Sequence, residues 1–460
     1  MKWIALLAML GLLPVFTGWL RTNPRQLPRV MAVFGVLPFV TNTWHLLLAP
    51  ISWAYWPGFV KGTEVTLIDV IAIALIFSAP PRQRRAHLRW PVLTYAVMVL
   101  LSMAQNDVPM STFFYVWQLL RVALVITAVA IVCRDPRAMR GLILGLILGI
   151  CFQAVMSLKA HAQGALQSGG TLGHQNLLGM LTHFVIFPSL AMLLATRKSR
   201  WLWLGPIGGL MAVVLTASRA TIGFSAIGVV LTLALSMLRQ PSARKTTVAL
   251  AGVLALVAAA PLAYVTLGAR FSQHTDDSGD YDERAAFERA AAAMARDHPL
   301  GVGGNHYAVI ANTGGYSERA GVAAVFGSRS AHVHNAFLLA AAETGYAGLA
   351  VFVLMLLWPV WVALRCAWRF RRDPRGDVLL GLAVSLVMVS LHSKYEWIFV
   401  LFITQYMYAI AVGLIAGMAA QMGYWTPRAR RRTAGADRAD AATDDVQGGD
   451  QAAEKMDKIP

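Results

Sequence analysis

Long apolar segments recur along nearly the whole chain, and they constrain its fold more than any other feature. A helix needs roughly 20 apolar residues to cross about 30 Å of hydrocarbon, and such segments follow one another almost to residue 420. The sequence therefore predicts an all-α polytopic membrane protein of about 12–13 transmembrane helices, in one integral membrane domain over residues 1–424. The candidate spans lie at residues 2–20, 30–49, 64–80, 91–104, 113–133, 141–158, 176–196, 202–217, 220–238, 246–266, 336–364, 378–392 and 397–420.

Charged residues are too few for an ordinary soluble enzyme. Of 460 residues, 14% are charged and 57% are hydrophobic, whereas average soluble domains carry about 25% charged residues. The net charge of +17 does not indicate a nucleic-acid partner, because Lys and Arg form short clusters between apolar segments rather than one polar face. The three cysteines, Cys133, Cys151 and Cys366, leave no pair for an exported disulfide.

The basic clusters assign each loop to a side of the membrane. They fall in every second loop, which the positive-inside rule places in the cytoplasm. These clusters are Arg21/Arg25/Arg29, Arg82/Arg84/Arg85/Arg89, Arg134/Arg137/Arg140, Arg197/Lys198/Arg200, Arg239/Arg244/Lys245 and Arg365/Arg369/Arg371/Arg372/Arg375. The alternate loops then face outward, at residues 50–63, 105–112, 159–175, 218–219, 267–333 and 392–396. The loop at 267–333 is the longest and lies between two late spans.

The two ends of the chain leave one question of topology open. Strict alternation of the loops places the N-terminus outside. If Leu12-Leu13-Pro14 breaks the first segment into a re-entrant hairpin, both ends instead lie inside, because proline disrupts a helix interior. Residues 425–460 carry few large apolar side chains, so we expect them to form a disordered cytoplasmic tail.

A helix is expected within the longest outward loop, at residues 282–297. Phe287, Ala290 and Met294 recur there at helical spacing, which predicts an amphipathic helix that lies at the membrane interface. Pro299 should end this helix. The three glycines that follow it within five residues predict a flexible turn, where the backbone can approach a ligand closely.

Ionisable residues at the outer ends of spans are candidates for function, because a membrane makes them costly to place. His332 and His334 stand where a long apolar segment begins. A helix N-terminus favours neutral imidazole and nearby anions, so His334 is a candidate general base beside a phosphate. A capping or interfacial histidine without chemistry is the alternative. A metal site is a third interpretation, but outward carboxylates do not surround the two histidines at any recognised ligand spacing.

Outward-facing cations suit an anionic substrate. Arg219 follows Ser218 at a junction too short to be a free loop, and a fixed guanidinium there can bind pyrophosphate through paired hydrogen bonds. The alternative for Arg219 is an anchor that snorkels to water. Arg284, on the predicted loop helix, is either a second such group or the partner of Glu288 in an exposed i,i+4 pair. Lys61 is another outward cation.

Two further polar segments border predicted spans. Gly170-Thr-Leu-Gly173-His174-Gln175-Asn176 leads into the seventh span. Leu391-His392-Ser-Lys394-Tyr395-Glu396-Trp397 joins the last two. The second segment either binds part of a glycan or an acceptor, or anchors the chain at the interface.

Taken in order, these motifs resemble the O-antigen ligase and polymerase superfamily. The resemblance spans residues 160–365 and is strongest from His334 to Gly348. The motifs that carry it are Gly170…His174-Gln-Asn176, then Ser218-Arg219, then Arg284 ahead of Pro299-Leu-Gly-Val-Gly303, and finally His334-Asn335…Glu343-Thr-Gly345.

The resemblance implies a transferase of the bacterial inner membrane with a periplasmic active site. Such proteins are metal-independent inverting glycosyltransferases, without a cofactor, whose donor glycan is linked to undecaprenyl diphosphate. By this resemblance, His334 would activate the acceptor hydroxyl, while Arg219 and Arg284 would hold the donor pyrophosphate. Arg289 lies on the same short helix and could take the place of Arg284. The predicted substrate-binding residues are Lys61, His174, Asn176, Arg289, Asn335, Glu343, His392 and Lys394.

Several reactions share this donor chemistry. The leading expectation is ligation of the glycan to a sugar hydroxyl of the lipid A-core, within a membrane of lipids and without nucleic acid. Polymerisation of repeat units on the carrier and transfer to Ser or Thr of an exported protein are the alternatives. A glycan transporter or flippase is the alternative from another class, but it should show internal repeats or interrupted helices, and the sequence shows no convincing repeat.

Overall fold

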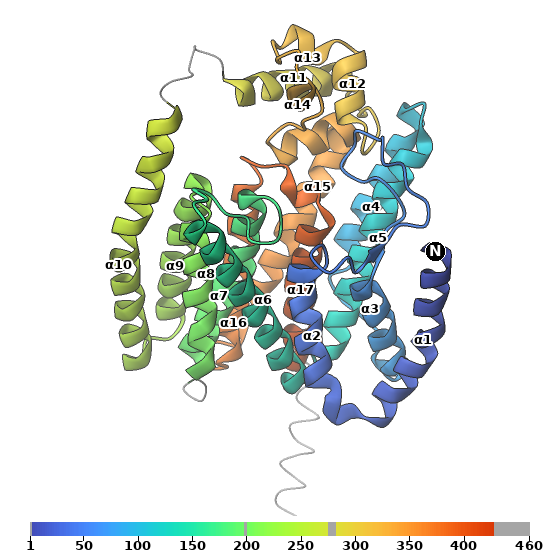
Figure 1. Ribbon diagram of the computed structural model, residues 1–460. Helices are drawn as coiled ribbons and strands as arrows, with labels where there is room; N and C mark the ends of the chain where they lie inside the picture. Colours follow the sequence, from blue (N-terminus) through green and yellow to red (C-terminus); the bar gives the residue numbers. More distant parts are fainter. Residues whose placement is uncertain (1, 197–199, 275–281, 427–460) are drawn as a thin grey trace, which may run out of the picture. The chain divides into compact units, whose positions relative to one another are not determined.

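Helices make up nearly all of the regular structure. The computed structural model describes residues 2–196, 200–274 and 282–426 (Figure 1). Its α-helices are α1 (Lys2–Thr22), α2 (Leu27–Val40), α3 (Leu67–Ser78), α4 (Trp90–Ser102), α5 (Pro109–Val132), α6 (Pro136–Ala162), α7 (Gln175–Ala195), α8 (Leu204–Leu215), α9 (Arg219–Arg239), α10 (Ala243–His274), α11 (Glu283–Asp297), α12 (Tyr307–Thr313), α13 (Tyr316–Arg319), α14 (Phe326–Arg329), α15 (Ala336–Arg369), α16 (Arg375–His392) and α17 (Phe402–Gln421). The short elements are η1 (Pro24–Gln26), η2 (Pro81–Gln83), η3 (Met103–Gln105), η4 (Arg200–Trp203), η5 (Ile398–Val400), β1 (Leu47–Leu48) and β2 (Val65–Thr66).

Every apolar segment that the sequence marks as a span contains a helix, from α1 to α10 and from α15 to α17. Among the described residues, seven helices are long and apolar enough to cross a membrane, namely α5, α6, α7, α9, α15, α16 and α17. Shorter apolar helices lie at Leu6–Thr22, Leu67–Ser78, Trp90–Gln105 and Trp201–Leu215. The prediction of an all-α polytopic membrane protein is confirmed.

The chain divides into two units, Met1–Met418 and Ala419–Pro460. All helices that carry candidate site residues belong to the first unit. Most of the predicted tail, residues 427–460, lies outside the described residues.

The first helix settles one of the open points. α1 is continuous from Lys2 to Thr22 with Pro14 inside it, which excludes the re-entrant hairpin, one of the two alternatives that the sequence leaves open. A proline is tolerated inside an apolar membrane helix because neighbouring groups and small local adjustments satisfy the backbone groups that it frees. With α1 counted as a single segment, alternation of the basic loops predicts an outward N-terminus.

The second predicted span, residues 30–49, is too long. α2 ends at Val40, where the polar run Thr41-Asn42-Thr43 favours a turn over continued helix. Beyond the turn, Leu47 and Leu48 form β1, which pairs antiparallel with β2 so that Leu47 lies opposite Thr66. This pairing brings both ends of the loop at 50–63 together, the loop that the sequence predicts to face outward.

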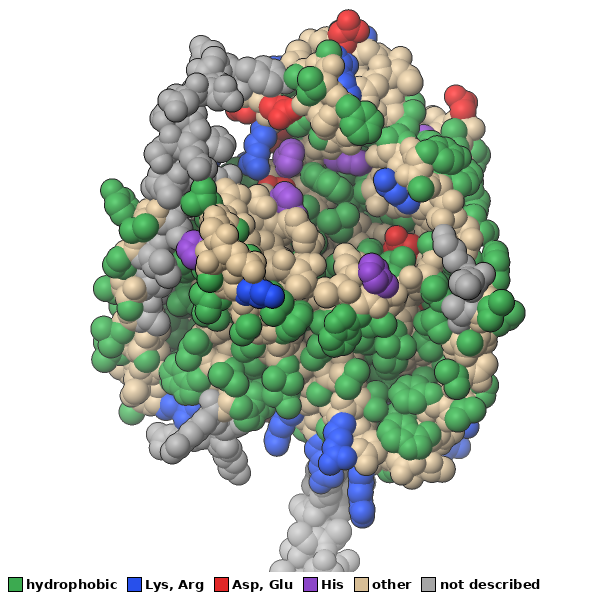
Figure 2. All heavy atoms as spheres, in the orientation of Figure 1, with side chains coloured by type: hydrophobic (Ala, Val, Ile, Leu, Met, Phe, Trp, Pro, Cys, Tyr) green, Lys and Arg blue, Asp and Glu red, His purple; other side chains and the backbone are tan. Residues whose placement is uncertain are grey.

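The loops predicted to be cytoplasmic contact one another. Arg134 donates from Nη1 to the Gln83 carbonyl oxygen at 2.9 Å, and Arg371 donates from Nε to the Arg239 carbonyl oxygen at 2.8 Å. Figure 2 shows Lys and Arg side chains at the lower end of the molecule, with a broad hydrophobic surface between them and the histidines. We call the end that carries α11 to α14 the distal end (Figure 1).

α11 confirms the helix expected at residues 282–297. Asp282 caps it, and its Oδ1 accepts hydrogen bonds from the backbone N–H groups of Arg284 and Ala285. Phe287, Ala290 and Met294 are buried, as the periodicity predicted. Their face packs against α12, α13 and α15, however, and not against lipid. The apolar stripe therefore docks a short helix onto the protein.

The glycine-rich turn after Pro299 fits into a break in α15. Gly345 has φ 69° and ψ −176°, so α15 consists of two helical segments that meet there. The Tyr346 N–H donates to the Pro299 carbonyl oxygen at 3.1 Å, and the Gly303 N–H donates to the Glu343 carbonyl oxygen at 2.9 Å. These bonds satisfy backbone groups that the break exposes.

The glycines of this turn bring it close to α15, whereas the approach to a ligand that the sequence suggests stays a prediction. A Cβ atom on Gly301 would lie 2.3 Å from the Glu343 carbonyl oxygen, so the glycine allows contact between the turn and α15. Two motifs that are about 40 residues apart in the chain thus form one backbone junction beneath the distal end.

We expect Gly345→Ala to lower the stability of the protein by at least about 2 kcal/mol, because a side chain at this φ and ψ is strained. Its Cβ would also lie 2.3 Å from the Pro299 carbonyl oxygen. Thermal unfolding in detergent measures the effect. Gly223→Ala in α9 is the control, since a Cβ there meets nothing within 4 Å. Equal unfolding temperatures for the two variants would contradict the proposed role of the junction.

Candidate active site

A buried carboxylate at the distal end joins side chains from three separate segments. The Glu396 side chain, which follows α16, is 3% exposed. Its Oε1 accepts hydrogen bonds from Asn176 Nδ2 at 2.5 Å and Arg284 Nη2 at 3.1 Å. Its Oε2 lies 3.2 Å from His334 Nδ1. α7 brings Asn176, α11 brings Arg284, and the segment just before α15 brings His334. We call these four residues the Glu396 cluster.

The surroundings of Glu396 favour its ionised form. Burial by itself raises the pKa of Glu396, but the hydrogen bond and charge of His334 and the charges of Arg284 and His392 outweigh burial. The pKa therefore lies below its ordinary value of 4.5. At neutral pH the carboxylate is negative and can only accept hydrogen bonds.

The ionised carboxylate determines which nitrogen of His334 carries the proton. Because Glu396 only accepts, we assign the proton to Nδ1, which leaves the lone pair of the neutral ring on Nε2. In the described part of the chain, Nε2 has no hydrogen-bond partner. The side chain is 26% exposed, and its ring lies 6.1 Å from the ring of Phe287. A histidine oriented by a carboxylate, with its second nitrogen open, has the arrangement of a general base.

The structure separates the two arginines that the sequence could not distinguish. Arg284 contacts Glu396, yet its side chain is 55% exposed, so much of the guanidinium remains open to a ligand. Arg289 is exposed and donates from Nη2 to the Ala320 carbonyl oxygen at 3.0 Å, toward α13. Only Arg284 belongs to the Glu396 cluster.

His174 lies beside the cluster. As the residue that caps α7, it accepts a hydrogen bond at Nδ1 from the Asn176 backbone N–H at 3.2 Å. Burial lowers the pKa of His174, Glu396 raises it, and the charges of His334 and Arg284 lower it further, so that the pKa lies below 6.5. His174 and Asn176, the two candidate residues at the start of α7, therefore lie beside His334 and Arg284.

Asn335 and Glu343 have anchoring positions. Asn335 Oδ1 accepts hydrogen bonds from the Phe337 and Leu338 backbone N–H groups, which fixes the start of α15 next to His334. Glu343 is 2% exposed, and its Oε1 accepts from the Tyr307 backbone N–H at 3.0 Å. Glu343 thus contacts the protein backbone, and its substrate-binding role stays a prediction.

Arg219 is the exposed first residue of α9, and Ser218 caps this helix. The hydrogen bonds described for Glu396 involve Asn176, Arg284 and His334. The helix that Arg219 begins reaches the neighbourhood of the cluster, because the Phe224 ring lies 5.5 Å from the ring of His392. The N-terminus of α9, with its partial positive charge, thus lies about one and a half turns from that contact.

His392, Lys394 and Lys61 lie outside the cluster. His392 is fully buried, and its Nδ1 lies 3.2 Å from His183 Nε2, so the ring packs inside the helices. Lys394 is exposed. Lys61 donates from Nζ to the Ala54 carbonyl oxygen at 3.4 Å within the 50–63 loop. The structure does not join these three to His334 in one group.

Glu396 is the residue that the sequence reasoning missed, although its segment was recognised. The available signal was an acidic side chain at the outer end of a span, where an unpaired charge is costly. We selected His392 and Lys394 in this segment because a polar segment at a span boundary suits binding of part of a glycan or an acceptor. A buried anion that holds the cations of the site in place is equally necessary, and its partners lie about 60 to 220 residues away in the chain.

We expect the stability advantage of the wild type over Glu396→Gln to decrease as the pH falls. A carboxyl group whose pKa is lowered by folding stabilises the folded protein above the unfolded pKa, and this contribution is lost as the pH falls through the folded pKa. The difference in unfolding temperature should therefore be largest at neutral pH and should narrow toward about pH 3. Thermal unfolding across this range tests the prediction. A constant difference would mean that Glu396 is not ionised in the folded protein.

The helices and the cluster define a polytopic membrane protein with a polar, ionic site at one end of its helices. Residues 204–353 match the family model for O-antigen ligase, and this match confirms the predicted resemblance to the O-antigen ligase superfamily. The match includes Arg219, Arg284 and His334. No curated protein matches the chain.

Proposed function

We propose that this protein transfers a glycan from undecaprenyl diphosphate to a sugar hydroxyl of the lipid A-core, at the periplasmic face of the bacterial inner membrane. The observation that carries this proposal is the Glu396 cluster, in which one carboxylate holds His334 and Arg284 at 3.2 and 3.1 Å. A base and a cation in adjacent positions suit a displacement in which a hydroxyl attacks and an anion leaves.

In the proposed reaction, each bond that forms or breaks has a residue of the site assigned to it. His334 Nε2 takes the proton from the acceptor hydroxyl, whose oxygen bonds to the anomeric carbon of the donor glycan from the face opposite the leaving group. The bond between that carbon and the diphosphate oxygen breaks, and undecaprenyl diphosphate leaves with the electron pair. Arg284, and Arg219 at the start of α9, stabilise the negative charge that develops on it. Inversion of the anomeric centre follows from this geometry, and no metal is needed.

A cavity within the helices supports a donor with a long apolar chain. It has a volume of about 470 Å³ and lies between α7, α8, α9 and α10. Ile186, Leu210, Ile222 and Val229 are among its mainly aliphatic lining residues. Arg219 begins one of the helices that form it, so a diphosphate at Arg219 could continue into a polyprenyl chain in this cavity.

The test is transfer by the purified protein from undecaprenyl-diphosphate glycan, with EDTA present throughout. Three acceptors are compared: lipid A-core, a second molecule of lipid-linked glycan, and a Ser/Thr-containing peptide. Product on lipid A-core alone supports the proposal. Product only on the second or third acceptor would replace ligation with polymerisation or protein glycosylation. Dependence on a divalent cation would contradict the metal-independent mechanism.

A further inference from the structure

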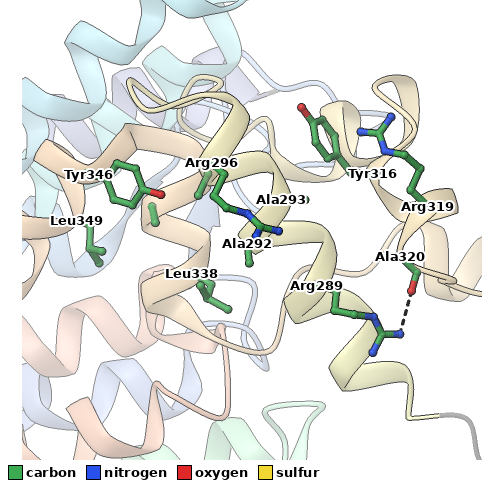
Figure 3. A pocket seen from close by; sticks show the side chains of 12 residues that line it. Arg289, Ala292, Ala293, Arg296, Tyr316, Arg319, Ala320, Leu338, Tyr346 and Leu349 are labelled. Carbon is green, nitrogen blue, oxygen red and sulfur yellow. Dashed lines mark hydrogen bonds between the residues drawn. The ribbon is translucent and has the colours of Figure 1, made fainter.

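A second cavity lies at the distal end, on the other side of α11 from the Glu396 cluster. It has a volume of about 500 Å³, opens to the surface and is lined by residues of α11, α13 and α15 (Figure 3). Arg289, Arg296 and Arg319 line it together with Tyr316, Tyr346 and Leu338. We call it the arginine pocket. It combines a cationic side with apolar groups, as a site for an amphiphilic anion requires.

The positive charge of the arginine pocket is not balanced by acids in its lining. All three arginines are exposed, and no Asp or Glu is among the lining residues. In the part of the chain that the structure describes, Arg296 makes no hydrogen bond or ion pair. The neighbouring carboxylate of Asp297 accepts a hydrogen bond from the Tyr316 hydroxyl at 3.0 Å. The Arg319 guanidinium lies 4.6 Å from the Tyr316 ring centre, which orients it beside the pocket.

The surface below the pocket has the character of a lipid contact. Tyr346, Leu357 and Trp361 are each at least half exposed on α15. Their separations of 11 and 4 residues place them on one face of this helix, in line with the pocket. Exposed apolar side chains on a membrane helix contact acyl chains. A pocket at the outer end of the same face therefore lies at the level of lipid head groups.

We propose that the arginine pocket binds the phosphate head group of an anionic lipid from the outward-facing leaflet, with its acyl chains along the exposed face of α15. Guanidinium groups bind phosphate through paired, charge-assisted hydrogen bonds, and Arg296 has all of its donors available. The site is separate from the Glu396 cluster, because Arg289 and Arg296 lie on a different face of α11 from Arg284. The proposal does not depend on the glycosyltransferase activity.

Lipid retention by the detergent-purified protein tests this site. Native mass spectrometry compares bound phosphatidylglycerol with bound phosphatidylcholine, for the wild type and for Arg296→Gln/Arg319→Gln. We expect the pocket variant to lose at least about tenfold in affinity for phosphatidylglycerol, because two charged hydrogen-bond donors are removed. The control is Lys159→Gln/Arg329→Gln, which removes the same charge elsewhere on the predicted outward side and should retain phosphatidylglycerol like the wild type.

A second variant tests the charge without removing any contact. Ala293→Glu places a carboxylate in the pocket, at a helical position that glutamate tolerates well (Figure 3). We expect it to release phosphatidylglycerol while the protein unfolds at the wild-type temperature. Unchanged retention in both pocket variants would overturn the proposal, as would equal binding of phosphatidylcholine by the wild type. Competition by inorganic phosphate at concentrations equal to the lipid would assign the pocket to a free anion instead.

Discussion

Glu396→Gln is expected to lower kcat for glycan transfer by about 10²- to 10³-fold, while the KM for the donor changes less than about threefold. In the wild type, the carboxylate accepts from His334 Nδ1 at 3.2 Å and leaves Nε2 free to take a proton. A glutamine can instead donate its amide N–H to Nδ1, which moves the ring proton to Nε2 and abolishes the base. Steady-state kinetics with the lipid-linked donor measure both constants.

A purely structural role of Glu396 would give a different result. Loss of folding would lower the amount of active protein for every acceptor and every substrate concentration, and thermal unfolding would reveal it. Glu396→Asp keeps the charge and should recover part of kcat, whereas Glu318→Gln, at an exposed position of α13, should leave transfer unchanged. If Glu396→Gln raised the donor KM with kcat unchanged, Glu396 would be a donor-binding group and not the residue that positions the base.

The sequence predicts the fold well because a membrane-spanning helix requires a long apolar segment, which is a simple pattern to recognise. Each apolar segment is long enough to be recognised without knowledge of its neighbours, and the helices appear where the apolar runs occur. The predicted boundaries are wrong where a helix ends inside an apolar run, because hydropathy alone does not mark that end. The second span was extended past Val40 because Leu46-Leu47-Leu48 is as apolar as a helix, although it is used in a turn and a strand.

The site is only partly predictable because its members are brought together from distant segments. His334, Arg284 and Asn176 were recognised as single residues at the outer ends of helices. Nothing local indicates that Glu396 joins them, since its pairing requires three helices to be placed correctly. The junction of Pro299 with Gly345 is a similar case. Both glycine-containing motifs were visible, but their contact depends on a break in α15 that a continuous apolar run conceals.

Spacing along α11 explains why the choice between two arginines needed structure. Arg284 and Arg289 are 5 residues apart, which rotates them by about 140° around the helix axis. They therefore cannot serve the same site. The sequence shows that they differ in direction, but only the packing of α11 on α15 shows which one faces His334.

This difference leads to the sharpest comparison among the variants. Arg284→Gln is expected to lower kcat/KM for transfer by at least about 10²-fold, because it removes a fixed cation from the diphosphate as negative charge develops there. Arg289→Gln should change kcat/KM by less than about threefold, since its guanidinium is directed to the Ala320 carbonyl oxygen on the other side of α11. The two substitutions remove the same group from the same short helix. Transfer assays under matched conditions measure both, and thermal unfolding shows that each variant is folded.

The comparison of the two variants shows whether transfer depends on the position of one arginine or on the total positive charge of α11. If both variants lost activity equally, the total positive charge of α11 would matter, and attraction of the donor would replace stabilisation of the leaving group as the explanation. Raising the ionic strength would then reduce wild-type activity to the level of the variants, because such attraction is screened within about 10 Å at 0.1 M salt. A loss confined to Arg284→Gln, and preserved at high salt, would place the leaving diphosphate beside the residue that Glu396 holds next to His334.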